Sequence, residues 1–247
     1  MDQVVWSGFE VPLLERQGKK GETGETSETG EEFDLFNTSI LTGLTGLTGL
    51  ADHNRCQIEW PMSGKNPEGR SAEVGARIRR CTSDDVGTVA SLGARLFVQA
   101  YGPTHPEPDQ SLYLASAYSL ETIGAAIDGD RSSVFLAEDA DGVAIGYAHI
   151  WETDEFPAGV EGSRAFEIVR FYVDAAVQGR GVGAALMIHC CDVAKRAGAD
   201  VIWLQTWSEA PWAIGFYLRM GFSIVGKKAF HFGARVDSDH VMSLSLA

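Results

Sequence analysis

The sequence predicts a mixed α/β fold, with a largely antiparallel central sheet flanked by helices and a disordered N-terminal extension in front of it. Three observations support this prediction. The composition changes near residue 75, short alternating runs bounded by turn residues follow, and one strand leads through a glycine-rich loop into a helix and another strand. With 247 residues, 45% of them hydrophobic, the chain can build one large domain or two small ones. We assign residues 1–75 to the extension and residues 76–247 to a single domain.

The extension contains two repeats with a period of three residues. Residues 21–32 read GETGETSETGEE and have nothing to bury, whereas residues 41–50 read LTGLTGLTGL. The leucines would line one face in a polyproline II conformation, which has no internal hydrogen bonds and needs a partner. We therefore expect residues 1–75 to be mostly disordered. A partner-binding arm and a translation start at Met62 are the alternatives.

The domain is expected to begin with a short strand and two helices. Residues 76–80 favour a strand, and Thr82, followed by acidic residues, is a helix N-cap signal. The apolar spacing predicts a helix from there to about residue 100. Three prolines predict a loop over residues 101–108, and a second helix is predicted over residues 112–127.

The remainder of the domain alternates strands with helices. Residues 139–142 read DADG and predict a hairpin turn between two strands. Gly198 and Gly221 follow the two predicted helices as stop signals. The predicted elements are strands over 133–138, 143–151 and 166–173, a helix over 181–197, a strand over 201–207, a helix over 209–220, and strands over 222–230 and 236–246.

The charge balance limits the classes of partner. The chain has 34 acidic and 20 basic residues, a formal net charge of −14 at pH 7. Nucleic-acid binding and docking on anionic membranes both need an excess of Lys and Arg, so this balance argues against both. It suits a cationic or neutral small substrate instead, since negative charge attracts cations.

Cysteine usage and the N-terminus favour a cytoplasmic protein. Cys56, Cys81, Cys190 and Cys191 form no CxxC pair, which favours reduced thiols over a zinc site or a disulfide framework. The N-terminus has no basic segment typical of a signal peptide. The longest apolar run is also far shorter than the ~20 residues of a membrane helix.

The strongest functional signal lies in residues 173–186. A strand enters a turn containing Gly179, Gly181 and Gly183, and a helix follows. Such a turn presents unpaired backbone N–H groups at the positive end of a helix dipole, where glycine lets an anion approach closely.

Other interpretations of this turn are weaker. An ordinary glycine-rich helix start is the simplest of them. A dinucleotide-binding fold would need an acidic residue at the end of the next strand, which reads VIWLQTW and has none. A P-loop is excluded because no Gly-Lys-Ser/Thr follows the glycines.

Gln178-x-x-Gly181-x-Gly183 after a strand resembles the acyl-CoA signature of the GNAT acetyltransferase superfamily. Residues 213–222, which read AIGFYLRMGF, resemble a later motif of the same superfamily, and the likeness extends over residues 76–246. Within it, PaiA-like polyamine N-acetyltransferases are the most similar group, on the segments 97–102, 117–121, 225–233 and 237–242.

One position departs from the family pattern. Many relatives have Asn where this chain has Ala210, and that Asn usually holds the pantetheine arm or the helix start. Ser208 or Glu209 are the expected substitutes.

The resemblance implies the acyl-CoA N-acyltransferase fold and two catalytic residues. Tyr217 would occupy the position whose phenol faces the thioester sulfur, where it would protonate the departing thiolate. Glu167, eleven residues before Gln178, matches the catalytic glutamate of histone-type members. A base acting through water is useful because a primary amine with a pKa near ~10.4 is mostly protonated at pH 7. On spacing alone, a core tyrosine next to Phe216 is the favoured interpretation of Tyr217, and Glu167 can also be a substrate anchor or a partner of Arg170.

The resemblance also implies two binding surfaces. Backbone groups of Phe171, Tyr172 and Val173 would contact the pantetheine arm of acetyl-CoA. The pyrophosphate would lie against Gln178, Gly179, Arg180, Gly181, Val182, Gly183 and Ala184. The amine would lie between the first helices and the last strands, where aromatic and acidic side chains suit an alkylammonium group: Phe97, Tyr101, Trp151, Trp207, Asp237 and Asp239. No ligand spacing suggests a metal.

The sequence therefore predicts an N-acetyltransferase that moves an acetyl group from acetyl-CoA to a primary amine by direct attack in a ternary complex. A polyamine or another small amine is the favoured acceptor. The alternatives are an amino acid, antibiotic or protein amine, a different acyl donor or an O-acyl acceptor, and a non-catalytic acyl-CoA-binding regulatory module. The resemblance also allows a homodimer through the C-terminal strands.

Overall fold

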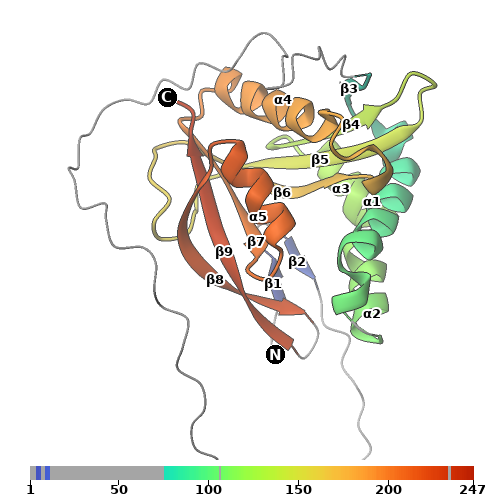
Figure 1. Cartoon of the computed structure of the whole chain (residues 1–247), viewed down its shortest axis with the longest axis horizontal. Coiled ribbons are helices and arrows are strands. Elements are labelled where there is room, and N and C mark those ends of the chain that lie inside the picture. Colours follow the sequence, from blue (N-terminus) through green and yellow to red (C-terminus); the bar gives the residue numbers. More distant parts are fainter. Residues whose placement is uncertain (1–3, 7–8, 12–74, 106, 233–234) are drawn as a thin grey trace, which may run out of the picture. The chain divides into compact units, whose positions relative to one another are not determined.

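A computed structural model describes residues 4–6, 9–11, 75–105, 107–232 and 235–247 of the chain (Figure 1). A seven-stranded sheet has the order β3-β4-β5-β6-β7-β9-β8. Every neighbouring pair is antiparallel except β6 and β7, which are parallel. Its strands are β3 (Arg77–Arg80), β4 (Ser132–Glu138), β5 (Ala144–Thr153), β6 (Ala165–Val173), β7 (Val201–Trp207), β8 (Ser223–Phe232) and β9 (Arg235–Ser245). The mixed, largely antiparallel sheet is confirmed.

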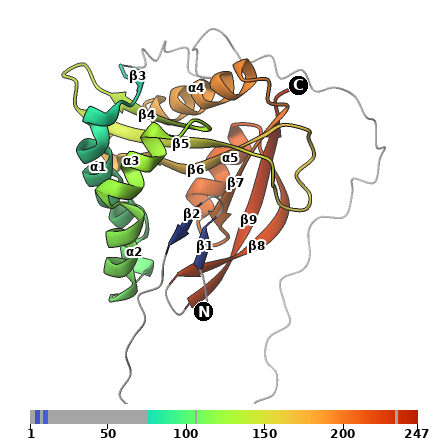
Figure 2. The ribbon, with the colours of Figure 1, turned by 180° about the vertical axis from the view of Figure 1, so that it is seen from behind.

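Helices cover both faces of this sheet (Figures 1 and 2). One face packs on α1 and α3, and we call it the α1 face; α4 packs on β5 and β6 from the opposite face, the α4 face. The helices are α1 (Val86–Tyr101), α2 (Asp109–Ala117), α3 (Leu120–Asp128), α4 (Val182–Arg196) and α5 (Pro211–Arg219). Among the described residues, no helix is both long and apolar enough to cross a bilayer.

Most of the N-terminal extension lies outside the described residues, including both period-three repeats. Two short strands, β1 (Val4–Trp6) and β2 (Phe9–Val11), pair antiparallel in a sheet of their own. The prediction for the extension did not include this hairpin.

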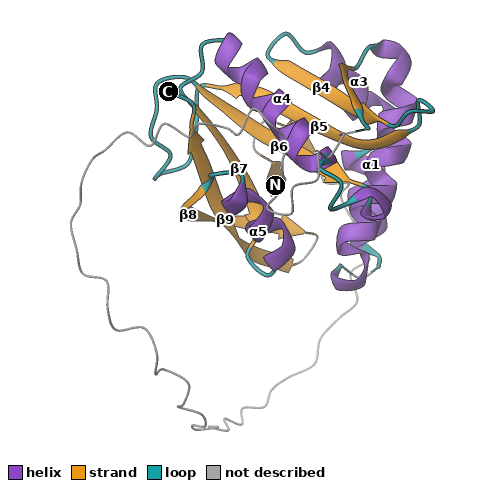
Figure 3. Cartoon of the chain, turned by 45° about the horizontal axis from the view of Figure 1, so that its top comes forward, coloured by secondary structure: helices purple, strands orange, loops and turns teal. Residues whose placement is uncertain are grey.

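The central feature of the sheet is a separation between β6 and β7 (Figure 3). The two strands pair only over Ala165–Ile168 and Val201–Leu204. Beyond that point β6 stays with β5 as far as Val173, while β7 stays with β9 as far as Trp207. A β-bulge at Val169, where the β5–β6 register shifts, increases the local twist at the start of this separation. The open backbone edge that results positions the functional site.

The larger core cluster lies on the α1 face and explains why the helices dock there. Buried Val89, Leu92 and Leu96 recur along α1 at helical spacing, and Ile123 and Ile127 do so along α3. They meet Val134, Leu136 and Tyr147 of β4 and β5.

Three predicted elements are corrected by the structure. The helix expected over residues 112–127 is two helices, because the Ser119 hydroxyl accepts the Thr122 N–H at 3.0 Å and starts α3 there. The loop expected over residues 101–108 begins as the last residue of α1 and a 3-10 turn, Gly102–Thr104. The helix expected from residue 209 begins at Pro211, a residue suited to the first helical position.

An ion-pair network fixes the start of α1. Arg79 donates to both oxygens of Asp85, at 2.7 and 2.8 Å, and to Glu138 at 2.7 Å. Hydrogen bonds from Arg79, and then from the Thr82 backbone, lower the pKa of the Asp85 carboxyl to about 2. A pKa lowered by folding stabilises the protein above the unfolded value near ~4, and that stabilisation is lost as the pH falls through about 2.

We expect Asp85→Asn to lower the free energy of unfolding at pH 7 by about 1–2 kcal/mol, with the difference shrinking toward pH 2. Thermal unfolding at several pH values measures it. Asp84→Asn, at the exposed neighbouring position, is the matched control. Equal melting temperatures for the two variants at pH 7 would contradict this account of Asp85.

Candidate functional site

The separation of β6 and β7 leaves a backbone edge without a strand partner among the described residues. This edge includes Phe171, Tyr172 and Val173 of β6, the residues predicted to contact a pantetheine arm. Extended backbone of this kind can hydrogen-bond to the amides of a linear ligand as it would to another strand. One of its carbonyls, that of Val173, already accepts from the Gln178 side chain at 3.2 Å.

Side chains of this part of β6 point alternately to the two faces of the sheet. The ring of Phe171 stacks on Phe216 of α5, with centroids 5.6 Å apart. The ring of Tyr172 stacks on Tyr147 on the α1 face, at 5.8 Å. The backbone between them is therefore held from both sides by aromatic packing.

The glycine-rich turn after β6 is held in place from α1. Asp174 accepts the Ala176 N–H at 3.0 Å, and the Gln99 side chain accepts the Ala175 N–H at 3.1 Å. Arg95 of α1 pairs with Asp174 at 2.6 Å. These contacts fix the 3-10 turn Ala175–Val177, which leads into the glycines.

Two glycines of this turn have left-handed backbone conformations that L side chains rarely adopt. Gly179 has φ 76° and Gly181 has φ 86°, and Gly181 is the N-cap of α4. Its carbonyl accepts the Ala185 N–H at 3.0 Å, so the N–H groups of residues 182–184 have no acceptor inside the helix. Gly183 faces Phe216, since an added Cβ would lie 3.3 Å from that ring. The turn thus has the features of an anion cradle and fits a pyrophosphate, with exposed Arg180 beside it.

Tyr217 of α5 lies among aromatic rings beside the separation between β6 and β7. Its ring is 6.4 Å from Phe171 and 5.8 Å from Phe222, and the residue is 8% exposed. Burial, and then the neighbouring Tyr101 phenol, raise the pKa of the Tyr217 phenol above its usual value. The phenol therefore stays protonated through the neutral pH range and can serve as a proton donor.

Ala210, where many relatives have Asn, is fully buried at the start of α5. Its N–H donates to the Trp207 carbonyl at 3.1 Å, and its carbonyl accepts from Ala213 and Ile214. No side chain among the described residues caps this helix start, so Ser208 and Glu209 do not replace the Asn in that role. Backbone turns and Pro211 fix the helix start instead.

Glu167 is 4% exposed and lies in the paired part of β6, opposite Trp151 of β5 and Trp203 of β7. Its roles as a base, as a substrate anchor or as a partner of Arg170 stay predictions. Arg170 donates to the Ala117 carbonyl at 2.9 Å and lies over the Tyr118 ring, 5.2 Å from its centroid.

Three of the predicted acceptor residues meet in one aromatic cluster on the α1 face. Tyr101 lies 5.3 Å from Phe97 and 6.3 Å from Trp207. Two further members, which were not predicted from the sequence, are His105 and Phe232, whose rings are 4.4 Å apart. Only the tertiary fold brings them here, because His105 sits in the proline-rich segment and Phe232 at the end of β8.

Asp237 and Asp239 of β9 are buried carboxylates. Asp239 accepts from the Gln205 side chain of β7 at 3.2 Å. Burial raises the pKa of Asp239 to about 6, with the Gln205 hydrogen bond opposing the shift and the Asp237 charge adding to it. Asp239 in turn helps burial raise the pKa of Tyr101 to about 12. The acidic residues therefore stand next to the aromatic cluster.

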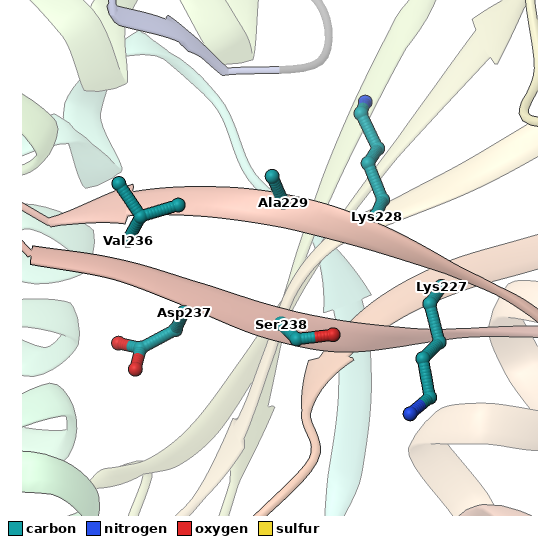
Figure 4. A pocket seen from close by; sticks show the side chains of 6 residues that line it. All are labelled: Lys227, Lys228, Ala229, Val236, Asp237 and Ser238. Carbon is teal, nitrogen blue, oxygen red and sulfur yellow. The ribbon is translucent and has the colours of Figure 1, made fainter. Parts of the chain in front are cut away.

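A shallow depression of about 260 Å³ lies on the β8–β9 hairpin (Figure 4). Of the residues that line it, only Asp237 was predicted as an acceptor residue, and the other five are half-buried or exposed. Because this depression is open to solvent, we take the separation between β6 and β7 as the candidate site instead.

Comparisons with known proteins show the family and the fold of this chain. The profile of the Acetyltransferase (GNAT) family matches residues 94–222, just over half of the chain. An uncharacterised N-acetyltransferase of Mycobacterium bovis is 27% identical over 158 residues, which cover 64% of this chain and 96% of that protein. Streptothricin acetyltransferase of Streptomyces lavendulae is 30% identical over 124 residues, which cover 50% of this chain and 62% of that protein.

Among solved structures, the PaiA N-acetyltransferase of Thermoplasma acidophilum in complex with coenzyme A has a similar fold. The TM-score is 0.56 at 18% sequence identity, covering 69% of this chain and 98% of that one. The acyl-CoA N-acyltransferase fold expected from the sequence is thereby confirmed. With the family profile covering both the glycine turn and Tyr217, this chain belongs to the acetyltransferase (GNAT) family and is an N-acetyltransferase of that type.

Proposed function

We propose that this protein acetylates a primary amine of a small cationic molecule, with a polyamine as the favoured acceptor. The observation that carries the proposal is the aromatic cluster of Phe97, Tyr101 and Trp207 with the buried carboxylate of Asp239 beside it, an environment that suits an alkylammonium group. Tyr217 also lies near this cluster, since the Tyr101 phenol contributes to the raised pKa of the Tyr217 phenol. The net charge of −14 further favours a cationic acceptor.

The proposed donor site uses the β6 edge and the glycine turn. Backbone groups of residues 171–173 hold the pantetheine arm, and residues 178–184 hold the pyrophosphate, with Arg180 adding a positive charge. Acetyl-CoA supplies the thioester that is cleaved. Tyr217 donates its proton to the sulfur that leaves.

The proposed acceptor site is the aromatic cluster with Asp237 and Asp239, and Trp151 beside Glu167. Glu167 works on the amine, either as a base through water or as its anchor. The amine attacks directly, without an acyl-enzyme. One observation supports direct attack. Cys190 lies near enough to Tyr217 to affect the pKa of that phenol, but it is fully buried. Burial raises the pKa of its thiol well above the usual value, so the thiol is a poor nucleophile for forming an acyl-enzyme.

A second acceptor class is favoured by one relative. Streptothricin acetyltransferase is named for its action on an antibiotic, and it shares 30% identity with this chain over 124 residues. An antibiotic amine is therefore the main rival to a polyamine.

The test is thiol release from acetyl-CoA by the full chain with spermidine, spermine, streptothricin, free lysine and a lysine peptide. We expect the two polyamines to give the highest kcat/KM. Preference for streptothricin or the peptide would replace the polyamine by that acceptor. If no amine in the panel gives thiol release while acetyl-CoA still raises the melting temperature, a role in acyl-CoA binding alone would be favoured over an enzyme acting on these amines. The cytoplasmic location and a homodimer through β8 and β9 stay predictions, which fractionation and light scattering address.

A further inference from the structure

Asp239 is a buried carboxylate, and one of its oxygens has no hydrogen-bond donor among the described residues. The residue is 6% exposed, and its Oδ2 accepts from Gln205 at 3.2 Å. Its Oδ1 is buried and has no hydrogen-bond partner among the described residues. Lys228 lies opposite Asp239 in the β8–β9 register, but its side chain points away from β9 in Figure 4, and no ion pair joins the two among the residues described. A buried carboxylate oxygen without a donor is costly unless a ligand supplies one.

The groups that face Asp239 come from four elements. Gln205 approaches from β7, Lys228 is its register neighbour on β8, Asp237 lies two residues earlier on β9, and Tyr101 approaches from α1. Only Lys228 is a cation, and it makes no ion pair with Asp239 among the described residues. Burial therefore dominates, and it raises the pKa of Asp239 to about 6. Such a carboxylate is mostly ionised at pH 7, yet it is basic enough to hold a proton briefly.

Asp239 also lies beside the aromatic cluster of the proposed acceptor site, because its charge acts on Tyr101. Tyr101 of α1 is half-buried, and its phenol interacts electrostatically with both Asp239 and Tyr217. We propose that Asp239 is a catalytic residue that removes the proton from the acceptor ammonium, which leaves Glu167 as the anchor of the substrate. This inference rests on the proposed amine acetylation.

The proton balance of this step is closed. Asp239 accepts one proton from the ammonium, so that the nitrogen lone pair forms the bond to the thioester carbon while the carbon–sulfur bond breaks and its electron pair goes to sulfur. Tyr217 gives its proton to that sulfur and regains one from the acylated nitrogen. Asp239 then releases its proton to water, so the sum is one amide, one thiol and one proton.

The test compares Asp239→Asn with wild type and with Glu167→Gln, using spermidine at pH 6 to 10. At pH 7, we expect Asp239→Asn to lower kcat/KM by about 100-fold. That loss should shrink to less than tenfold at pH 10, where a much larger share of the amine is already unprotonated and needs no base. Glu167→Gln should show a loss that does not depend on pH. A loss for Asp239→Asn that is equal at every pH, or a loss that shrinks with pH only for Glu167→Gln, would overturn the proposal.

A second measurement is independent of the acceptor. Because folding raises the pKa of Asp239, ionising it costs stability as the pH rises from about 4 to about 6. Asp239→Asn should therefore melt at a higher temperature than wild type at pH 7 and at the same temperature at pH 4. A lower melting temperature at pH 7 would identify a structural partner of the carboxylate and overturn the proposal. If wild type does not acetylate spermidine, the proposed acceptor fails, while this measurement still decides whether Asp239 is the uncompensated carboxylate that a base requires.

Discussion

Replacing Tyr217 with phenylalanine is expected to lower kcat by about 10²–10³-fold while leaving acetyl-CoA affinity nearly unchanged. The ring would keep its contacts with Phe171 and Phe222, so packing around α5 should survive. In the proposed mechanism, what is lost is the proton for the departing thiolate, an interaction made only as the carbon–sulfur bond breaks. A loss in kcat without a loss in binding is the signature of such an interaction.

The measurement pairs initial rates of thiol release with calorimetric binding of acetyl-CoA. Tyr147→Phe is the matched control, because Tyr147 is a fully buried phenol in the core on the α1 face. In wild type, the raised pKa of the Tyr217 phenol means that kcat should not fall through loss of this proton below about pH 10. Unchanged turnover in Tyr217→Phe would remove the phenol from the mechanism.

Replacing Gly181 with valine should raise the KM for acetyl-CoA by about 100-fold. The φ of 86° costs an L residue about 1–2 kcal/mol. Relaxing that strain would rotate the peptide units that start α4, and each lost contact between an N–H group and an anion removes about 0.3–2 kcal/mol. Two such losses of about 1.4 kcal/mol each, within that range, come to about 2.8 kcal/mol, which is a factor of about 100.

Gly142→Val separates backbone strain from the loss of the anion cradle. Gly142 lies in the turn between β4 and β5 with φ 79° and has open space where a Cβ would be added. The two valine variants should lose similar stability in thermal unfolding, whereas only Gly181→Val should lose affinity for acetyl-CoA. If both variants bind acetyl-CoA as wild type does, the cradle lies elsewhere.

The sequence predicted the parts of the site that depend on local backbone. Gly179 and Gly181 were expected where the chain turns into a helix, and both have positive φ. The strands and the helix around them were expected because their periodicity is local. The break at Ser119 was missed because an N-cap inside an apolar helical pattern gives only a weak signal.

The aromatic cluster of the proposed acceptor site could be predicted only in part. Tyr101 and Trp207 do lie near each other, whereas His105 and Phe232 join them through contacts between α1, the proline-rich segment and β8. The basicity of Asp239 comes from burial between strands, and neither the sheet order nor the depth of a residue can be calculated from one sequence. The lack of a hydrogen-bond partner for Asp239 Oδ1 among the described residues likewise depends on how the fold packs.

The unpaired stretch of β6 has a consequence for the life of the protein in a cell. Strand edges without partners are sites where chains pair wrongly with other chains, and within the described part of the chain β6 has such an edge in the middle of the sheet. Acyl-CoA bound along that edge would act as the missing strand. A ligand present at 100 times its Kd adds about 2.7 kcal/mol to the stability of the folded state. The amount of intact enzyme would therefore follow the supply of acyl-CoA, so that starvation for this metabolite would deplete the catalyst as well as its substrate.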